Sequence, residues 1–300
     1  MSAARSGRFR RLSGWLWASA AVFFWGVMFP VGDLLMKKGS MPPESVGFFR
    51  YVLAFPPLFL AGAAASGWRS MVPHGPREWF ETAVLGLIGS AAMADLLFAA
   101  QRSVSSVNAS LLEAYVPMQV MALSFLGGAP VTRRRVASVA LGFAGCMLVL
   151  KAVDASGIRL AALSRGDALV FLSGLCWAVY TALGRGPSRR MGGPAFTVWT
   201  VFFGAFWLFV RGAAAGALPA PPATLLEWKC ILFLALFPTG ISFLGWNQAQ
   251  KSLSLAQLGF MEYVPPVVAA ATAACAFGEA VTPLQWLGMA IVLLSAKILD

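Results

Sequence analysis

Two glutamates stand in apolar surroundings within stretches of nearly repeated sequence. Residues 100–117 are AQRSVSSVNASLLEAYVP and residues 249–265 are AQKSLSLAQLGFMEYVP, with Glu113 and Glu262 at matching places. A charged side chain at the centre of a bilayer costs on the order of 2.5–3.5 kcal/mol, so such acids usually face water or a partner. We expect both carboxylates to line a polar cavity, where they bind an ammonium group or exchange a proton. The alternative is that each one only bonds a neighbour and fixes helix packing.

Prolines follow both acids closely. Pro117 lies four residues after Glu113, and Pro265 and Pro266 follow Glu262. Because proline has no N–H group, the carbonyl four residues earlier loses its helical partner. We therefore expect both helices to bend at Pro117, Pro265 and Pro266, which are candidate hinges, and the carbonyls beside the acids to be free.

Aromatic and polar side chains inside the apolar runs are further candidates for substrate contact. Trp17, Phe24 and Met28 share one helical face, and Trp177 and Tyr180 are three residues apart on another helix. Aromatic rings stack on planar groups and attract cations, but interfacial anchoring and core packing are the alternatives. The predicted substrate-binding set is Glu113, Glu262, Trp17, Phe24, Trp25, Asp95, Tyr115, Trp177, Tyr180, Asn247 and Tyr263.

Asp95 has two interpretations. It is either a third carboxylate of the cavity or the ion partner of Arg50, a basic residue placed deep in an apolar run. Both interpretations place Asp95 inside the helical bundle, because an unpaired charge facing hydrocarbon is costly.

The composition identifies the medium in which these residues act. Of the 300 residues 59% are hydrophobic and 12% charged, with a mean hydropathy of +0.74, whereas soluble domains carry about 25% charged residues. The sequence predicts an all-α membrane protein. The net charge of +11 lies mostly in clusters between apolar runs, which predicts contact with the lipid bilayer and no nucleic-acid partner.

Ten apolar runs are long enough, or nearly so, to cross a bilayer core about 30 Å thick. They are residues 14–36, 43–65, 79–101, 104–127, 136–151, 166–183, 195–215, 228–250, 253–277 and 283–299. Lysine and arginine are more frequent in the loops on the side of the N-terminus, so we expect both termini in the cytoplasm, with the chain in a bacterial inner membrane.

The repeated stretches predict two halves, residues 1–152 and 153–300, of five helices each. Trp25 and Trp177 also occupy similar places in the first and sixth runs. Because five is odd, the second half enters the membrane inverted, which is the plan of many secondary transporters. The expected fold is two inverted five-helix repeats around a central cavity, and exchange of their shapes gives alternating access.

The stretches FFWGVMFP, EAYVP, EYVPP and FGEAVTPLQWLGMAIVL resemble the drug/metabolite transporter superfamily, of the EamA type. Within it the chain is most similar to bacterial aromatic amino acid exporters of the YddG type. The resemblance implies a central cavity between the halves, with the fifth and tenth helices bracing them. The first half departs from the closing motif, since residues 127–130 are GGAP where the second half has FGEA at 277–280.

The leading function is secondary export of aromatic or neutral amino acids and related small metabolites, with protons as a candidate coupling ion. Exporters of multiple drugs or lipophilic cations fit the acids and aromatics equally well. A nucleotide-sugar or phosphometabolite transporter is a further alternative, which would need more basic groups at depth. No metal or other cofactor is expected. We expect no enzyme, because the lone His74 lies in a loop and no paired-aspartate motif occurs. A channel, and the choice between monomer and homodimer, remain open.

Overall fold

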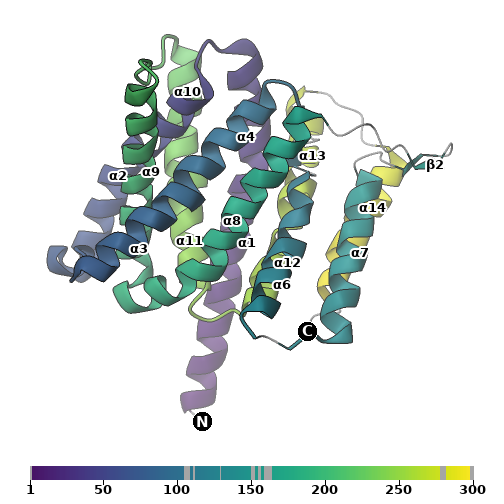
Figure 1. The fold of residues 1–300 in the computed structure, drawn as a ribbon. Helices are drawn as coiled ribbons and strands as arrows, with labels where there is room; N and C mark the ends of the chain where they lie inside the picture. Colours follow the sequence, from purple (N-terminus) through teal and green to yellow (C-terminus); the bar gives the residue numbers. More distant parts are fainter. Residues whose placement is uncertain are drawn as a thin grey trace.

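Helices make up nearly all of the described chain (Figure 1). The computed structural model describes residues 2–104, 109–110, 112–128, 130–149, 153–154, 157–158, 164–277 and 282–297. The elements up to residue 149 are α1 (Ser2–Lys38), α2 (Pro43–Ser66), the 3-10 turn η1 (Trp68–Met71), α3 (Pro76–Gly86), the π-helical η2 (Leu87–Ala92), α4 (Met93–Gln101), the 3-10 turn η3 (Glu113–Tyr115), α6 (Val116–Leu126) and α7 (Arg133–Val149).

A two-residue antiparallel pair, β1 (Val153–Asp154) and β2 (Gly157–Ile158), precedes the remaining helices. These are α8 (Arg165–Met191), α9 (Gly193–Ala214), α10 (Leu225–Leu234), the π-helical η4 (Ala235–Ile241), α11 (Ser242–Ala249), α12 (Leu255–Met261), α13 (Val264–Phe277) and α14 (Pro283–Lys297). Capping boxes begin α8 at Ser164, α10 at Thr224 and α12 at Ser254.

Seven helical segments of the described residues are long and apolar enough to cross a membrane, so the chain is a multi-pass membrane protein. They are Arg11–Lys38, Pro43–Ser66, Pro76–Gln101, Arg165–Met191, Gly193–Ala214, Leu225–Ala249 and Leu255–Cys275. The other three expected spans contain the shorter helices α6, α7 and α14, of 11, 17 and 15 residues. The sixth expected span ends at residue 183, and the helix that contains it, α8, continues to Met191. Arg189 and Arg190 lie in its last turn, where cations stabilise a helix end.

Helices from the first part of the chain pack against helices from the second part. The helix α2 packs against α9 and α7 packs against α14, which are corresponding pairs, and α6 packs against α12. The helices α7 and α14 lie side by side at one edge of the bundle (Figure 1), where the Ser138 hydroxyl donates to the Ser295 carbonyl at 2.8 Å. The core therefore lies between helices of the first and second parts of the chain.

The two π-helical segments occupy matching places. A shift of 149 positions takes residues 87–92 of η2 onto residues 236–241 of η4, and the same shift takes Glu113 to Glu262. Each segment has a carbonyl that accepts a bond from a neighbouring aromatic side chain. The Tyr51 hydroxyl donates to the Ser90 carbonyl at 3.0 Å, and Trp25 Nε1 donates to the Pro238 carbonyl at 2.9 Å. Single π turns inside α-helices often mark functional sites.

Candidate functional site: a cavity between the halves

Glu113 and Glu262 line the same small cavity, of about 30 Å³, although they are far apart in the sequence. Trp25 of α1 and Trp177 of α8 line it with them, as does Arg50 of α2. Met28, Met93, Phe243 and Pro265 are the remaining lining residues. A cavity of this size has room for about one water molecule.

The two carboxylates have different partners. Glu262, 6% exposed, accepts a hydrogen bond of 2.7 Å from Trp177 Nε1. Glu113 lies 3.5 Å from the Ser173 hydroxyl, which also donates to the Met93 carbonyl at 3.0 Å. Because a hydroxyl has one proton, the longer contact to Glu113 is the weaker of the two. Glu113 is therefore less firmly held than Glu262.

Regular helix is interrupted at both acids, as the prolines predict. Glu113 begins the 3-10 turn η3 before α6, and Glu262 and Tyr263 form a turn between α12 and α13. The expectation of a free carbonyl at Glu113 is wrong, because the Val116 N–H donates to it. The tighter 3-10 bond uses the residue before Pro117 and so replaces the missing helical partner. Whether the three prolines act as hinges stays a prediction.

The tryptophans form an aromatic wall between the two parts of the chain. The rings of Trp25 and Trp177 meet edge to face at 4.8 Å, and Trp25 contacts Trp246 at 5.1 Å. Tyr180 stacks on Trp177 at 5.1 Å and is not among the lining residues. Edge-to-face geometry is the favoured arrangement of aromatic pairs. The wall is thus a fixed surface against which a planar group can lie.

Several predicted site residues lie outside this lining. Trp17 is 38% exposed, Phe24 contacts Phe237, and Tyr115 contacts Phe143 and Phe171. The Asn247 side chain donates to Tyr180 Oη and Thr197 Oγ1. The Tyr263 hydroxyl donates to the Val139 carbonyl at 3.0 Å. In this state Asn247 and Tyr263 therefore serve helix packing, and a role of these residues in substrate contact is untested.

The suggested ion pair between Arg50 and Asp95 is wrong. Asp95 pairs with Arg211 at 2.9 Å, whereas Arg50 Nε donates to Thr239 Oγ1 at 2.9 Å. Thr239 and Arg211 lie on helices that are distant in the sequence from Arg50 and Asp95. The packing of these helices therefore determines which side chains can pair. Arg50, Met93 and Phe243 are lining residues that the sequence analysis did not assign to the site. For Arg50, the sequence offered one indication of a role in the site, which is its position deep in an apolar run.

A larger pocket, of about 430 Å³, lies between α6, α7, α8 and α12. Pro117 and Tyr263, close to the two acids in sequence, line it together with Ser124, Arg185 and Ser254. Its volume falls in the range of small-molecule sites, about 300–1,000 Å³. The pocket lies where α6 ends and where α7 and α12 begin, which is the end of the bundle at which α1 begins (Figure 1).

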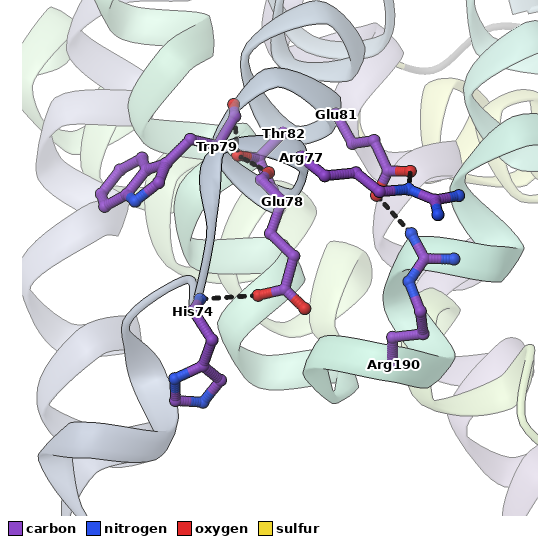
Figure 2. A network of polar contacts seen from close by, with 7 residues as sticks. All are labelled: His74, Arg77, Glu78, Trp79, Glu81, Thr82 and Arg190. Carbon is purple, nitrogen blue, oxygen red and sulfur yellow. Dashed lines mark hydrogen bonds and ion pairs between the residues drawn. The ribbon is translucent and has the colours of Figure 1, made fainter.

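Ion pairs link helices at both ends of the bundle. At the end where α3 begins, Glu81 pairs with Arg77 of its own helix at 2.9 Å and with Arg190 at the end of α8, as Figure 2 shows. In the same network the Glu78 carboxylate accepts from the His74 N–H at 2.8 Å, which confirms that His74 lies in a loop.

At the opposite end, where α2 begins and α9 ends, Arg211 contacts Asp95 and also Glu44, at 3.5 Å. Glu227 accepts from the Ser40 N–H at 2.8 Å near the same end. Each end of the bundle thus has ion pairs between α8 or α9 and helices of the first part of the chain.

No group of three residues able to hold a metal ion occurs within the described ranges. Cys176, Cys230 and Cys275 are free. The closing stretch of the sequence resemblance, residues 278–281, lies outside the described residues, as does Ala129 of its counterpart.

Comparisons with known proteins find membrane transporters. The profile of the EamA-like transporter family matches the chain twice, at residues 12–151 and 164–299. An uncharacterized transporter, YyaM, of Bacillus subtilis is 27% identical over 70% of each chain. An uncharacterized transporter of Archaeoglobus fulgidus is 26% identical over 80% of this chain and 81% of its own. The uncharacterized inner membrane transporter YedA of Escherichia coli is 25% identical over 95% of this chain and 90% of its own.

A solved crystal structure has the same fold. It superposes with a TM-score of 0.76 over 96% of each chain at 19% sequence identity. At this identity the likeness concerns the fold alone.

Proposed function

We propose, from the premise that the chain belongs to the EamA-like transporter family, that it exports amino acids and related small metabolites by alternating access. It is a membrane transporter and not an enzyme. The observation that carries the proposal is that two repeat-related pairs, Trp25 with Trp177 and Glu113 with Glu262, meet in one cavity. A ligand placed there contacts both parts of the chain equally, as a carrier's central site requires.

We infer that residues 1–152 and 153–300 are inverted repeats of five helices. The double match of the family profile supports this arrangement. The packing of α2 with α9 and of α7 with α14 supports it as well, because a pseudo-two-fold axis can bring equivalent helices together. The matching π-helical segments η2 and η4 add a third, independent correspondence.

The chemistry of the cavity suits a ligand with an ammonium group and a planar side chain. Carboxylates at Glu113 and Glu262 attract a cation, and the tryptophan wall offers an aromatic surface. Aromatic amino acids have both features, and other neutral amino acids have the ammonium group, so exporters of the YddG type remain the subtype we propose. A lipophilic cation exporter is the second candidate, since it would use the same acids and rings.

The small cavity that the two acids line and the larger pocket together suggest a path for the substrate through the protein. The larger pocket receives the substrate at the end of the bundle where α1 begins, which we assign to the cytoplasm, with both termini on that side. Movement at Pro117, Pro265 and Pro266 then joins this pocket to the space between the two acids. We propose a bacterial inner membrane location, with protons as the coupling ion; YedA, a relative, is an inner membrane transporter.

Uptake by proteoliposomes tests the proposal. Purified protein should take up labelled phenylalanine, tryptophan or a neutral amino acid, faster with a pH gradient than without one. Glu113→Gln and Glu262→Gln should each lower the rate at least about tenfold. Full transport activity of both variants at every pH would contradict a role of Glu113 and Glu262 in transport. Counterflow of labelled against unlabelled substrate would distinguish a carrier from a channel.

A further inference from the structure

Arg50 is a fully buried cation in a membrane-spanning helix. Its exposed fraction is 0%, and it lies in the first third of α2. A charge in this position is costly unless it has a partner or lines a polar cavity, and intramembrane ionisable residues usually mark a substrate path. The groups that contact the Arg50 guanidinium therefore indicate its role.

The contacts of Arg50 are with neutral groups. Nε donates to Thr239 Oγ1 at 2.9 Å and Nη1 contacts the Met28 sulfur, a weak acceptor, at 3.2 Å. The guanidinium carbon lies 5.0 Å from the centre of the Tyr51 ring and 5.7 Å from that of Phe98. Nη2 has no hydrogen-bond partner among the residues that the structure describes. The positive charge is held by dipoles and rings, with one donor group left over.

The acids near Arg50 are engaged elsewhere. Asp95 is paired with Arg211, Glu262 accepts from Trp177, and Glu113 contacts Ser173. None of these carboxylates forms an ion pair with Arg50 in the described part of the chain. Yet Arg50, Glu113 and Glu262 all line the one cavity. The cavity is thus lined by an arginine and two carboxyl groups that do not pair with it.

We propose that Arg50 binds the carboxylate of the transported molecule, so that the site selects zwitterions over simple cations. Arginine's planar fork of donors matches a carboxylate in a bidentate arrangement. The ammonium group of the same molecule lies toward Glu262 and Glu113, and an aromatic or apolar side chain contacts the wall of Trp25 and Trp177. This inference rests on the proposed function and makes it specific: the substrate carries an α-amino and an α-carboxylate group together.

Three ligands that differ by one charged group test the inference on the unaltered protein. They are L-phenylalanine, L-phenylalaninamide, which lacks the carboxylate, and 3-phenylpropionate, which lacks the ammonium group. Binding is followed in detergent by tryptophan fluorescence, since Trp25 and Trp177 line the cavity. Phenylalanine should bind at least about tenfold more tightly than either analogue. Equal binding of the amide overturns the inference and leaves a cation exporter in place.

Variants at Arg50 then assign the preference to one residue. Arg50→Gln should bring phenylalanine and its amide within about threefold of each other, and Arg50→Lys should restore part of the difference. Arg69→Gln, at an exposed position of η1 and outside the cavity, is the matched control and should keep the full preference. A preference unchanged in folded Arg50→Gln overturns the assignment, with folding checked by thermal unfolding and gel filtration.

The outcomes separate this inference from the function on which it rests. Absence of binding by all three ligands contradicts both the inference and the proposed substrate class. Inorganic phosphate that competes with phenylalanine for the unaltered protein, but not for Arg50→Gln, confirms an anion site at Arg50. Binding of phosphate alone would overturn the zwitterion in favour of a phosphorylated metabolite.

Discussion

Trp177 donates its indole N–H to Glu262 at 2.7 Å, joining α8 to the break between α12 and α13 across 85 positions of sequence. Trp177 also forms the edge-to-face contact with Trp25, its counterpart in the first half of the chain. The Trp177 side chain therefore orients a carboxylate of the candidate site and also packs at the contact between the two halves of the chain.

Trp177→Phe keeps most of the ring packing but removes the donor to Glu262. A buried acceptor left without its partner costs about 1–3 kcal/mol, so we expect a lower midpoint of thermal unfolding and slower uptake. Trp286→Phe, at a position 59% exposed on α14, is the matched control and should change neither. Identical unfolding midpoints and uptake rates for the two variants would contradict a structural role of the bond.

Close packing at the π-helical segment gives a second prediction. A Cβ atom added at Gly89 would lie 2.3 Å from Tyr180 Cδ2, so Gly89→Ala forces either η2 or α8 to move. Overpacking of this kind costs about 1–3 kcal/mol, and we expect that loss in denaturant or thermal unfolding. At Gly186, an exposed position inside α8, an added Cβ meets only Arg190 Nη1, the far end of a flexible side chain, at 3.4 Å. Gly186→Ala should therefore not lower stability, and an equal loss in both variants would argue against the tight contact.

The prolines beside the acids give a third prediction. Pro117→Ala and Pro265→Ala restore a backbone donor and let regular helix extend toward Glu113 and Glu262. If the breaks act as hinges, turnover falls severalfold while the apparent affinity for substrate stays near its original value, as separate measurements of kcat and KM would show. Pro187→Ala, within the continuous helix α8, is the control. Unchanged turnover in the first two variants would restrict these prolines to helix shape.

The ion pairs at the two ends give a fourth prediction. Arg190→Gln removes the link between α8 and α3, whereas Arg211→Gln removes the link of α9 to Asp95 and Glu44. Partly exposed pairs contribute at most about 1 kcal/mol each, so overall stability should change little. The balance between states open to either side should shift by up to about fivefold, in opposite directions.

A cysteine at Ser124, in the larger pocket, reports this balance when the natural cysteines are replaced by serine. Arg190→Gln should speed its labelling by an impermeant maleimide, because it loosens the end where that pocket lies. Arg211→Gln should slow the labelling. A change in the same direction for both variants would be incompatible with gates at opposite ends.

Sequence patterns were sufficient to predict the apolar helices and the meeting of Glu113 with Glu262. In the inverted-repeat arrangement that we propose, equivalent residues of helices beside the pseudo-two-fold axis lie near one another, so a match in sequence there predicts closeness in space. The same reasoning explains why Trp25 and Trp177 are found together. These predictions needed only periodicity and the depth of each residue in its run.

The partners of Arg50 and Asp95 could not be predicted in this way. Thr239 lies 189 positions from Arg50, and Arg211 lies 116 positions from Asp95. Which helix faces which depends on side-chain packing over the whole bundle. The π-helical segments were also missed, because LIGSAA and ALFPTGI are as apolar as the ordinary helix around them.

Each π-helical segment directly precedes a residue of the cavity, Met93 after η2 and Phe243 shortly after η4. An α-helix turns about 100° per residue, so a segment that holds one residue more than an α-turn changes the phase of everything beyond it. Rewinding η4 as regular α-helix with the same residues would rotate α11 by about that angle and carry Phe243 off the lining. The winding of η2 and η4, more than the identity of their residues, thus determines which faces of α4 and α11 a solute meets.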